Sequence, residues 1–414
     1  MTAGVWGYGR EGRAALDWLL RTGDEDVLVF DDRPQELPPR DRVRMAVDFA
    51  ELAGCARCLV SPGVPHTDPR RQDLIRAGVV LQTGTQLWMR DHHERAVGIT
   101  GTKGKSTTAA LIHHVLSRNG RENQLAGNIG VPLLDVPPAP RYVVELSSYQ
   151  CESLDQSPDI AVITQLAWDH VPAHGSVEAY WRAKAKIFSQ HGRILICAQD
   201  TLDSLREVGA DTDAVDVRVV EPVDPAPGWP PALGYPHNRG NAGLALAAAA
   251  AAGVERDEAV AAAASFRPLE HRLEPVATTE RGLVWISDVL ATTQESAKAA
   301  LNTFIHHPVT MIIGGQDRGQ PIDDLARHVA TAQRSGSVRM ITMGETAQRF
   351  AADLEQAGVR DVHSVGTLAE AVALARRISP DDTAVLLSPA APSYDQFRDF
   401  EAKSAALRDL VANR

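Results

Sequence analysis

Residues 98–108 read GITGTKGKSTT and lie between a short apolar stretch and a helix expected to end near Arg118. A glycine-rich loop between a strand and a helix offers backbone N–H groups to a triphosphate, and its lysine reaches the terminal phosphates. In this run the lysine is Lys105, and the Ser106 hydroxyl is a potential Mg²⁺ ligand. Gly98 precedes Lys105 by seven positions, one more than the common P-loop spacing. The stretch predicts a nucleoside triphosphate site in an α/β domain.

Short apolar strands alternate with amphipathic helical stretches around this loop and through most of the 414 residues. This alternation is typical of α/β proteins with parallel sheets, and the length predicts two or three domains. We place the domains at 1–93, 94–271 and 272–414, with a Pro-rich loop at 221–236 before a helix at 241–252. The expected strands are 27–30, 58–60 and 79–81 in the first domain, 96–99, 142–146, 160–164 and 193–197 in the second, and 311–313, 339–343, 362–365 and 384–387 in the third.

A second glycine-rich loop lies near the amino terminus. Residues 7–12 read GYGREG, a G-x-G-x-x-G run between a strand and a helix, and Asp31 follows the next strand. Such glycines let the backbone approach a diphosphate, and the acid can hold a ribose hydroxyl. Alone, the run fits an NAD-dependent dehydrogenase or a tight turn without a ligand.

Net charge, hydropathy and cysteine usage argue against several other classes of protein. A net charge of −11 disfavours nucleic acid and anionic membranes as partners. The most apolar run, 244–252, is far shorter than the ~20 residues of a membrane span. The amino terminus lacks the pattern of a signal peptide, so we expect a cytoplasmic protein without membrane insertion. Cys55 and Cys58 form a lone C-x-x-C pair, for which metal or redox use is disfavoured.

The string T-G-T-x-G-K-[ST]-T is the form used by the Mur ligases and their folate-ligase relatives, and this chain resembles them. The ending at 388–397 (SPAAPSYDQF) and the opening glycine loop with Asp31-Asp32-Arg33 look like the glutamate-adding, MurD-type members. The resemblance implies three domains: a Rossmann-like UDP-binding domain, a P-loop ATPase-like domain and a Rossmann-like carboxyl-terminal domain. Further segments in Mur-ligase order are SPG at 61–63, GNIG at 127–130, ELSSYQ at 145–150, DH at 169–170, HN at 237–238 with Asn241, and EHR at 270–272.

The resemblance implies an ATP-dependent ligase that adds glutamate to UDP-N-acetylmuramoyl-L-alanine through an acyl phosphate, in peptidoglycan precursor synthesis. The implied catalytic residues are Lys105, His170 and Lys184. ATP and two Mg²⁺ ions are the implied cofactors, with Ser106, Glu145, His170 and Lys184 at the metals. The implied ATP contacts are Gly101, Thr102, Lys103, Gly104, Lys105, Ser106, Thr107, Asn238, Asn241, Arg272 and Asp288.

Lys184 matches the family lysine that CO₂ carbamylates, which converts a cation into an anion able to bind a second Mg²⁺. Lys186 is a rival, because a small misalignment would exchange the two. From the same resemblance, the UDP contacts are Arg10, Glu11, Asp31, Asp32, Arg33, Gly63 and Asn128, and the glutamate contacts are Ser393, Phe400 and Arg318.

Departures from the family pattern surround the amino-acid pocket. Residues 288–293 read DVLATT where the D-glutamate enzymes have D-S-K-A-T-N, and Arg318 replaces a lysine. Residues 165–168 (QLAW) replace an Asn-led stretch. The opening loop and the Asp-Arg-Gly run at 317–319 look more like the branch that adds L-glutamate, whose product an epimerase inverts. We favour that branch and a monomeric enzyme.

Three alternatives remain: the D-glutamate-adding enzyme, a related ligase of secondary metabolism, and a nucleotide-binding regulator with an inactive site. The joint presence of Lys105, Ser106, Glu145, His170 and Lys184 disfavours the regulator.

Overall fold

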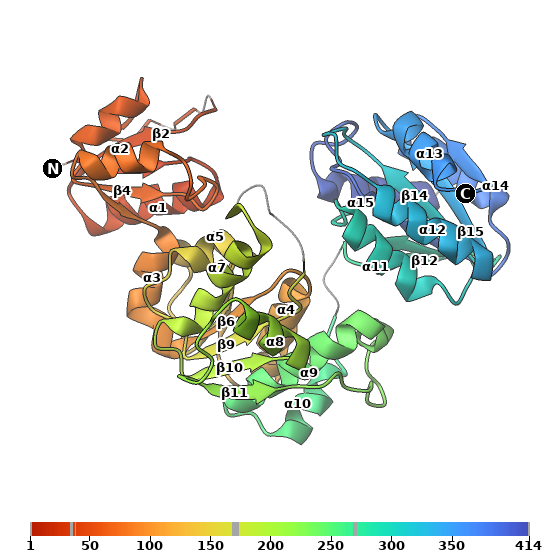
Figure 1. Ribbon diagram of the computed structural model, residues 1–414, viewed down its shortest axis with the longest axis horizontal. Coiled ribbons are helices and arrows are strands. Elements are labelled where there is room, and N and C mark those ends of the chain that lie inside the picture. Colours follow the sequence, from red (N-terminus) through yellow and green to blue (C-terminus); the bar gives the residue numbers. More distant parts are fainter. Residues whose placement is uncertain (1, 34–35, 38, 168–173, 268–270, 413–414) are drawn as a thin grey trace. The chain divides into compact units, whose positions relative to one another are not determined.

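The computed structural model describes residues 2–33, 36–37, 39–167, 174–267 and 271–412 (Figure 1). The chain divides into two compact units, Met1–Phe266 and Arg267–Arg414, and each is described by itself. Within the described residues, three mostly parallel sheets carry helices on their faces, so the predicted α/β class is confirmed. The first two sheets belong to the first unit. The boundaries near 93 and 271 stay a prediction.

The first sheet is parallel and has the strand order β3-β2-β1-β4-β5 in the described residues. Chain connections leave β1 in opposite directions, so the carboxyl ends of β1 and its neighbours form a switch point, where ligands bind in open α/β sheets. Its elements are β1 (Thr2–Trp6), α1 (Arg10–Thr22), β2 (Asp26–Phe30), β3 (Val43–Met45), η1 (Phe49–Gly54), β4 (Arg57–Val60), α2 (Arg70–Arg76), β5 (Val80–Gln82) and α3 (Gly84–His92).

The second sheet, also parallel, has the order β11-β10-β9-β6-β8-β7 in the described residues. β6 leads into the P-loop and lies between β8 and β9. The sheet and its flanks comprise η2 (His93–Arg95), β6 (Ala96–Thr100), α4 (Lys105–Arg118), β7 (Gln124–Gly127), η3 (Leu133–Asp135), β8 (Tyr142–Glu145), α5 (Ser148–Glu152), β9 (Ile160–Ile163), α7 (Val177–Ser189), β10 (Ile194–Cys197), α8 (Gln199–Glu207), β11 (Asp216–Val219), η4 (Pro231–Gly234), α9 (Pro236–Ala251) and α10 (Arg256–Ala263).

The second unit contains a sheet ordered β12-β13-β17-β14-β15-β16, in which β12 is antiparallel and the other described strands are parallel. Buried Val, Ile, Leu and Met side chains on both faces form its core. The elements are β12 (Glu274–Thr278), β13 (Val284–Ser287), α11 (Gln294–Phe304), β14 (Val309–Gly314), α12 (Asp323–Ser335), β15 (Val338–Met343), α13 (Ala347–Gln356), β16 (Val362–Ser364), α14 (Leu368–Ile378), β17 (Ala384–Leu387) and α15 (Phe400–Ala412).

The expected strands are all present, with ends that differ by up to two residues. The helix expected at 241–252 starts earlier than predicted, since α9 begins at Pro236. Proline suits the first turn of a helix because its fixed φ matches and its missing N–H would have no partner there. The early start puts Asn238 and Asn241 three positions apart on the same helix.

Two further observations bear on the sequence predictions. Cys55 and Cys58 are buried and free, and burial raises the pKa of both thiols, which opposes thiolate chemistry. Among the described residues, no helix has the length and apolar character needed to cross a membrane.

Candidate active site

The P-loop follows β6 and ends where α4 begins, at Lys105. Gly104 has φ +90°, and a Cβ at this position would lie 2.2 Å from Oδ1 of Asn241. Only glycine fits this position, because other side chains would be strained in conformation and would collide with Asn241. Lys105 Nζ donates to the carbonyl oxygens of Gly101 (2.9 Å) and Thr102 (3.0 Å). The predicted phosphate loop therefore lies at a helix N-terminus with its lysine folded over it.

The predicted ATP contacts on α9 lie beside this loop. Asn241 is buried and its Nδ2 donates to Oδ1 of Asn238 at 2.9 Å. Asn238 in turn donates to the carbonyl of Ala232 at 2.8 Å. Asn241 is thus held against Gly104, which brings the two predicted ATP-contact regions of this unit together.

Glu145 ends β8 and pairs in register with Ile99, next to the P-loop. Its side chain is only 1% exposed. Oε1 accepts a hydrogen bond from Nδ2 of Asn128 at 2.8 Å, whereas Oε2 has no hydrogen-bond partner among the described residues. A buried carboxylate oxygen without a partner is costly, so this geometry fits a metal ligand. The predicted ligand His170 lies outside the described residues.

Lys184 lies on the buried face of α7, with Tyr180, Ile187 and Phe188 at helical spacing. The side chain is 1% exposed, and Nζ lies 3.5 Å from Oγ1 of Thr100, the last residue of β6. The same nitrogen lies 4.5 Å from the centre of the Tyr180 ring. The Lys184 amine therefore extends from α7 to the end of β6, the strand that leads into the P-loop.

The rival Lys186 points elsewhere. It is half-buried, and Nζ donates to the carbonyl of Glu152 at 2.8 Å. The described residues include no group of three or more His, Cys, Asp and Glu side chains arranged to hold a metal. Mg²⁺ commonly keeps several waters and takes only one or two carboxylates, so such a cluster is not required.

The amino-terminal glycine loop is packed tightly at the carboxyl edge of the first sheet. A Cβ on Gly12 would lie 1.8 Å from the carbonyl oxygen of Gly7, so the third glycine of the run permits close helix–strand packing. The Asp31 carboxylate, after β2, fixes this loop through hydrogen bonds to main-chain N–H groups. Its Oδ2 accepts from the N–H of Tyr8 at 2.6 Å, and its Oδ1 accepts from the N–H of Arg33 at 2.8 Å.

Arg10 connects this loop with the 127–130 segment of the same unit. Its guanidinium donates to the carbonyls of Gly127 (2.7 Å) and Asn128 (3.1 Å). Neighbouring Glu11 is largely buried, and burial raises the pKa of its carboxyl group in spite of Arg10. Three of the predicted UDP contacts, Arg10, Glu11 and Asn128, therefore lie close together. A fourth, Gly63, lies exposed after β4.

In the second unit, Asp288 follows β13 and is buried. Oδ2 accepts from the Ser388 hydroxyl at 2.7 Å, and Oδ1 from the N–H of Leu273 at 3.3 Å. Burial raises the pKa of Asp288 to about 7, although the Ser388 hydrogen bond and the charge of Arg272 oppose the shift. The two predicted ATP contacts of this unit, Arg272 and Asp288, therefore interact.

This pKa predicts a pH-dependent stability. The folded Asp288 holds its proton up to about pH 7, whereas the unfolded carboxyl loses it near 3.8, so its contribution to the free energy of unfolding falls as pH rises between these values. A tenfold change in a proton-binding constant corresponds to about 1.4 kcal/mol. We expect Asp288→Asn to stabilise the second unit at pH 8 relative to the parent, and less so at pH 5.

Hydrogen–deuterium exchange in β13 and β17, compared between variant and parent at each pH, measures this unit alone. An asparagine keeps both hydrogen bonds, because its amide can donate to the Ser388 hydroxyl. An equal difference at pH 5 and pH 8 would contradict the raised pKa.

The predicted glutamate contacts lie in loops of the second unit. Ser393 is 4% exposed, and its Oγ has no hydrogen-bond partner among the described residues. The Arg318 guanidinium lies 5.7 Å from the centre of the adjoining Tyr394 ring, so Arg318 approaches the Ser393 loop. Phe400 begins α15 and packs edge-on against His271, with ring centres 5.6 Å apart.

Sequence reasoning missed one residue beside these loops. Lys403 is fully buried, and its Nζ donates to the carbonyl of Gly314, at the end of β14, at 3.3 Å. Burial lowers the pKa of this lysine to about 8. The sequence does indicate this burial, because Lys403 lies at helical spacing from the apolar residues Leu407 and Val411, which are buried on the same helix.

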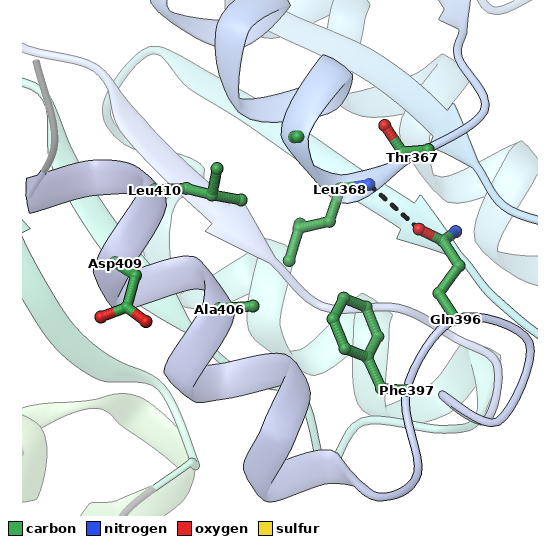
Figure 2. Close-up of a pocket in the computed structure, with 8 residues that line it drawn as sticks. Thr367, Leu368, Gln396, Phe397, Ala406, Asp409 and Leu410 are labelled. Carbon is green, nitrogen blue, oxygen red and sulfur yellow. Dashed lines mark hydrogen bonds between the residues drawn. The ribbon is translucent and has the colours of Figure 1, made fainter.

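An open pocket of about 490 Å³ lies between the start of α14 and α15 (Figure 2). Leu368, Phe397 and Leu410 give it an apolar lining, and Gln396 accepts a hydrogen bond from the N–H of Leu368 at its edge. None of the predicted glutamate contacts lines it.

Comparison with known proteins agrees with this geometry. Residues 99–218 match the Mur ligase middle domain, and residues 271–391 match the Mur ligase, glutamate ligase domain. The UDP-N-acetylmuramoyl-L-alanine–L-glutamate ligase of Micromonospora sp. is 40% identical, over 99% of this chain and 96% of that protein. The chain belongs to the Mur ligase family. This Mur ligase is also similar to enzymes named for either glutamate enantiomer.

Its L-glutamate relative from Salinispora tropica is 37% identical, over 98% of this chain and 96% of that protein. The UDP-N-acetylmuramoylalanine–D-glutamate ligase of Novosphingobium aromaticivorans is 36% identical, over 98% and 93%. Among solved structures, the MurC ligase of Thermotoga maritima aligns with a TM-score of 0.62 at 16% identity, covering 100% of both chains. MurF of Acinetobacter baumannii gives 0.63 at 16%, over 98% and 90%. These structures show that the Mur ligase fold is shared.

Proposed function

We propose that this Mur ligase uses ATP to join glutamate, preferentially L-glutamate, to the carboxyl end of UDP-N-acetylmuramoyl-L-alanine. One observation carries the proposal: a buried carboxylate, Glu145, ends the strand beside the P-loop with one oxygen lacking a hydrogen bond among the described residues. The named activities of the relatives supply the substrates. We also infer that the reaction takes place in the cytoplasm, early in peptidoglycan synthesis.

The chemistry requires two anions to meet. The alanine carboxylate attacks the γ-phosphorus of ATP and releases ADP, leaving an acyl phosphate. The glutamate amine then attacks the acyl carbon, phosphate leaves, and the amine loses a proton to give the amide. Because carboxylate and triphosphate repel each other, cations near both must lower the barrier.

Residues at the end of β6 suit this task. Lys105 would exchange its contacts with the carbonyls of Gly101 and Thr102 for contacts with phosphate oxygens. The backbone N–H groups at the start of α4 add positive potential at the same place. Asn241, held against Gly104, would contact the nucleotide from α9.

Magnesium fits the chemistry of the oxygen and nitrogen donors predicted for this site. Ser106, Glu145, His170 and a carbamylated Lys184 would hold two ions, and Mg²⁺ would supply charge neutralisation at the phosphates. Glu145 Oε2 supports this assignment because it is buried and has no hydrogen-bond partner in the described residues. Lys184 is supported over Lys186 by its burial and its approach to Thr100.

The preference for L-glutamate rests on the amino-acid pocket. Leu290 and Arg318 replace lysines of the D-glutamate enzymes, and Arg318 approaches the loop that carries Ser393. An arginine binds a carboxylate as a planar fork, whereas a lysine is a point charge, so the exchange shifts the bound amino acid. Enantiomers carry the same groups, and only the placement of the amine relative to the acyl carbon separates them.

We expect L-glutamate to predominate in the product when both enantiomers are supplied together at equal concentration. A misplacement of about 1 Å can cost about a hundredfold in rate, so one enantiomer should react far better. Chiral analysis of the glutamate released by hydrolysis of the product measures the ratio. Phosphate release with each enantiomer alone tests the ligase activity itself.

The outcomes separate the parts of the proposal. Mainly D-glutamate in the product would contradict the enantiomer assignment and leave the ligase intact. No phosphate release with either enantiomer would contradict the substrate assignment. If L-glutamate is incorporated, a separate epimerase must invert the product to supply the D-configured peptide.

A further inference from the structure

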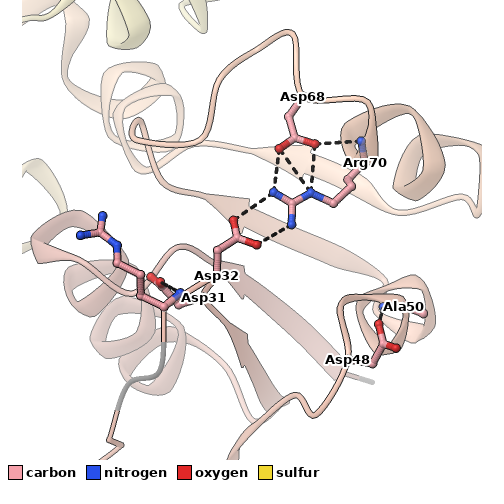
Figure 3. Close-up of polar contacts among 7 residues, drawn as sticks. Asp31, Asp32, Asp48, Ala50, Asp68 and Arg70 are labelled. Carbon is pink, nitrogen blue, oxygen red and sulfur yellow. Dashed lines mark hydrogen bonds and ion pairs between the residues drawn. The ribbon is translucent and has the colours of Figure 1, made fainter. Parts of the chain in front are cut away.

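Arg70, in the first turn of α2, joins two carboxylates from different segments of the first sheet (Figure 3). Nη1 and Nη2 contact the two oxygens of Asp32 at 2.6 and 2.9 Å. Nη2 and Nε contact Asp68 at 2.7 and 3.0 Å. Asp68 also accepts from the N–H of Arg70 at 2.9 Å. Forked contacts of this kind fix orientation as well as distance.

Aromatic rings support the same guanidinium. Its central carbon lies 5.0 Å from the centre of the Trp6 ring and 5.1 Å from that of Phe49. Trp6 is fully buried as the last residue of β1. Cation–π contact adds to the ion pairs, and the two rings limit where Arg70 can move. We call the set Asp32, Arg70, Asp68 and Trp6 the arginine brace.

The arginine brace spans the switch point of the sheet. Trp6 ends β1, Asp32 follows the neighbouring β2, and Asp68 follows β4 on the other side. Main-chain hydrogen bonds continue the connection, from the N–H of Gly7 to Phe30 and from the N–H of Ser61 to Trp6. These strand ends form the edge at which open α/β sheets bind their ligands.

The turn at 31–33 is therefore fastened from two directions. Asp31 is bound to the N–H groups of Tyr8 and Arg33, and Asp32 is bound to Arg70. Hydrogen bonds from Arg70 also lower the pKa of Asp32 and of Asp68. Loss of the arginine would release the turn and leave two unpaired negative charges at an edge that must receive a diphosphate.

We propose that Arg70 is a positioning residue for the uridine diphosphate end of the substrate. It holds the 31–33 turn against the loop after β4 and neutralises the carboxylates beside it. This role rests on the proposed function, in which these loops bind UDP. Arg70 acts through its partners and does not touch the reacting atoms.

Binding of UDP alone, measured by calorimetry on the full chain, tests the role. We expect Arg70→Ala to raise the dissociation constant for UDP about tenfold, and Arg70→Lys to raise it less, because a lysine keeps the charge without the fork. In turnover, KM for the UDP-linked substrate should rise about tenfold, while kcat and KM for ATP stay within about twofold. A general loss of structure would not give this split.

Arg76→Ala is the matched control. Arg76 ends the same helix and pairs with Asp73, but its side chain is 75% exposed and away from the arginine brace. Its removal should leave UDP binding unchanged. If Arg70→Ala does not fold, Arg70→Gln takes its place, since it keeps length and hydrogen-bonding capacity while removing the charge.

Two results would be decisive against different claims. UDP binding by Arg70→Ala equal to that of the parent would overturn the positioning role. A parent protein that binds ATP but not UDP would instead overturn the proposed function, whatever the variants do.

Discussion

Lys105→Ala is expected to lower the ligase rate at least about a hundredfold while leaving the protein folded. Lys105 is half-buried at the first position of α4, and its amine donates to the carbonyls of Gly101 and Thr102 within the loop. Its removal therefore leaves the apolar core of the second sheet intact. The variant lacks only the preorganised positive charge that would neutralise the ATP phosphates during phosphoryl transfer.

Phosphate release under saturating substrates gives kcat, and thermal denaturation checks the fold. Lys298→Ala, in α11 of the other unit, is a control for removing a lysine charge elsewhere. A Lys105→Ala enzyme with most of its turnover would show that the reacting ATP is not held by this loop. UDP binding should be unchanged in the variant, because that ligand is assigned to the first sheet.

The sequence predicted the parts of the site that depend on short segments. The P-loop between β6 and α4, and the glycine run before α1, are local patterns whose function requires a strand, a turn and a helix in that order. The strand ending at Glu145 was predicted for the same reason, since a continuous apolar run bounded by polar residues indicates a buried strand.

Contacts between distant segments could not be predicted in the same way. Asn128 stays a predicted UDP contact, and nothing in the sequence indicated that its amide also donates to Glu145, the expected metal ligand. The arginine brace joins Asp32 to Arg70 across 38 positions, and one arginine in a charged helix gives no signal of such a contact. These pairings depend on strand order, which periodicity does not encode.

The choice between Lys184 and Lys186 shows what the fold adds. Both lie in the same short charged and apolar run, and a two-residue misalignment exchanges them. On a helix, two positions correspond to about 200° of rotation, so only one of them can face the core. α7 turns Lys184 toward Thr100 and Lys186 toward the carbonyl of Glu152.

Lys184→Ala is expected to be inactive, with a loss of at least about a hundredfold, and to regain part of its rate in buffer that contains a small carboxylic acid. The side chain is buried, so its truncation leaves a space lined by α7 and the end of β6. Acetate or formate in that space would replace the two oxygens of the proposed carbamate, and with them the negative charge that would bind Mg²⁺. Phosphate release measured against acid concentration gives the rescue.

Two matched variants make the test specific. Lys184→Arg keeps a cation but fills the space and cannot be carbamylated, so we expect an inactive enzyme that acid does not rescue. Lys186→Ala should retain most activity, because its amine donates to the carbonyl of Glu152 on α5. Rescue of Lys186→Ala in place of Lys184→Ala would move the assignment by two residues. If acid rescues neither variant and CO₂ depletion leaves the parent rate unchanged, Lys184 is a buried structural lysine. A carbamate that holds the metal would be lost on CO₂ depletion, and the rate would then fall.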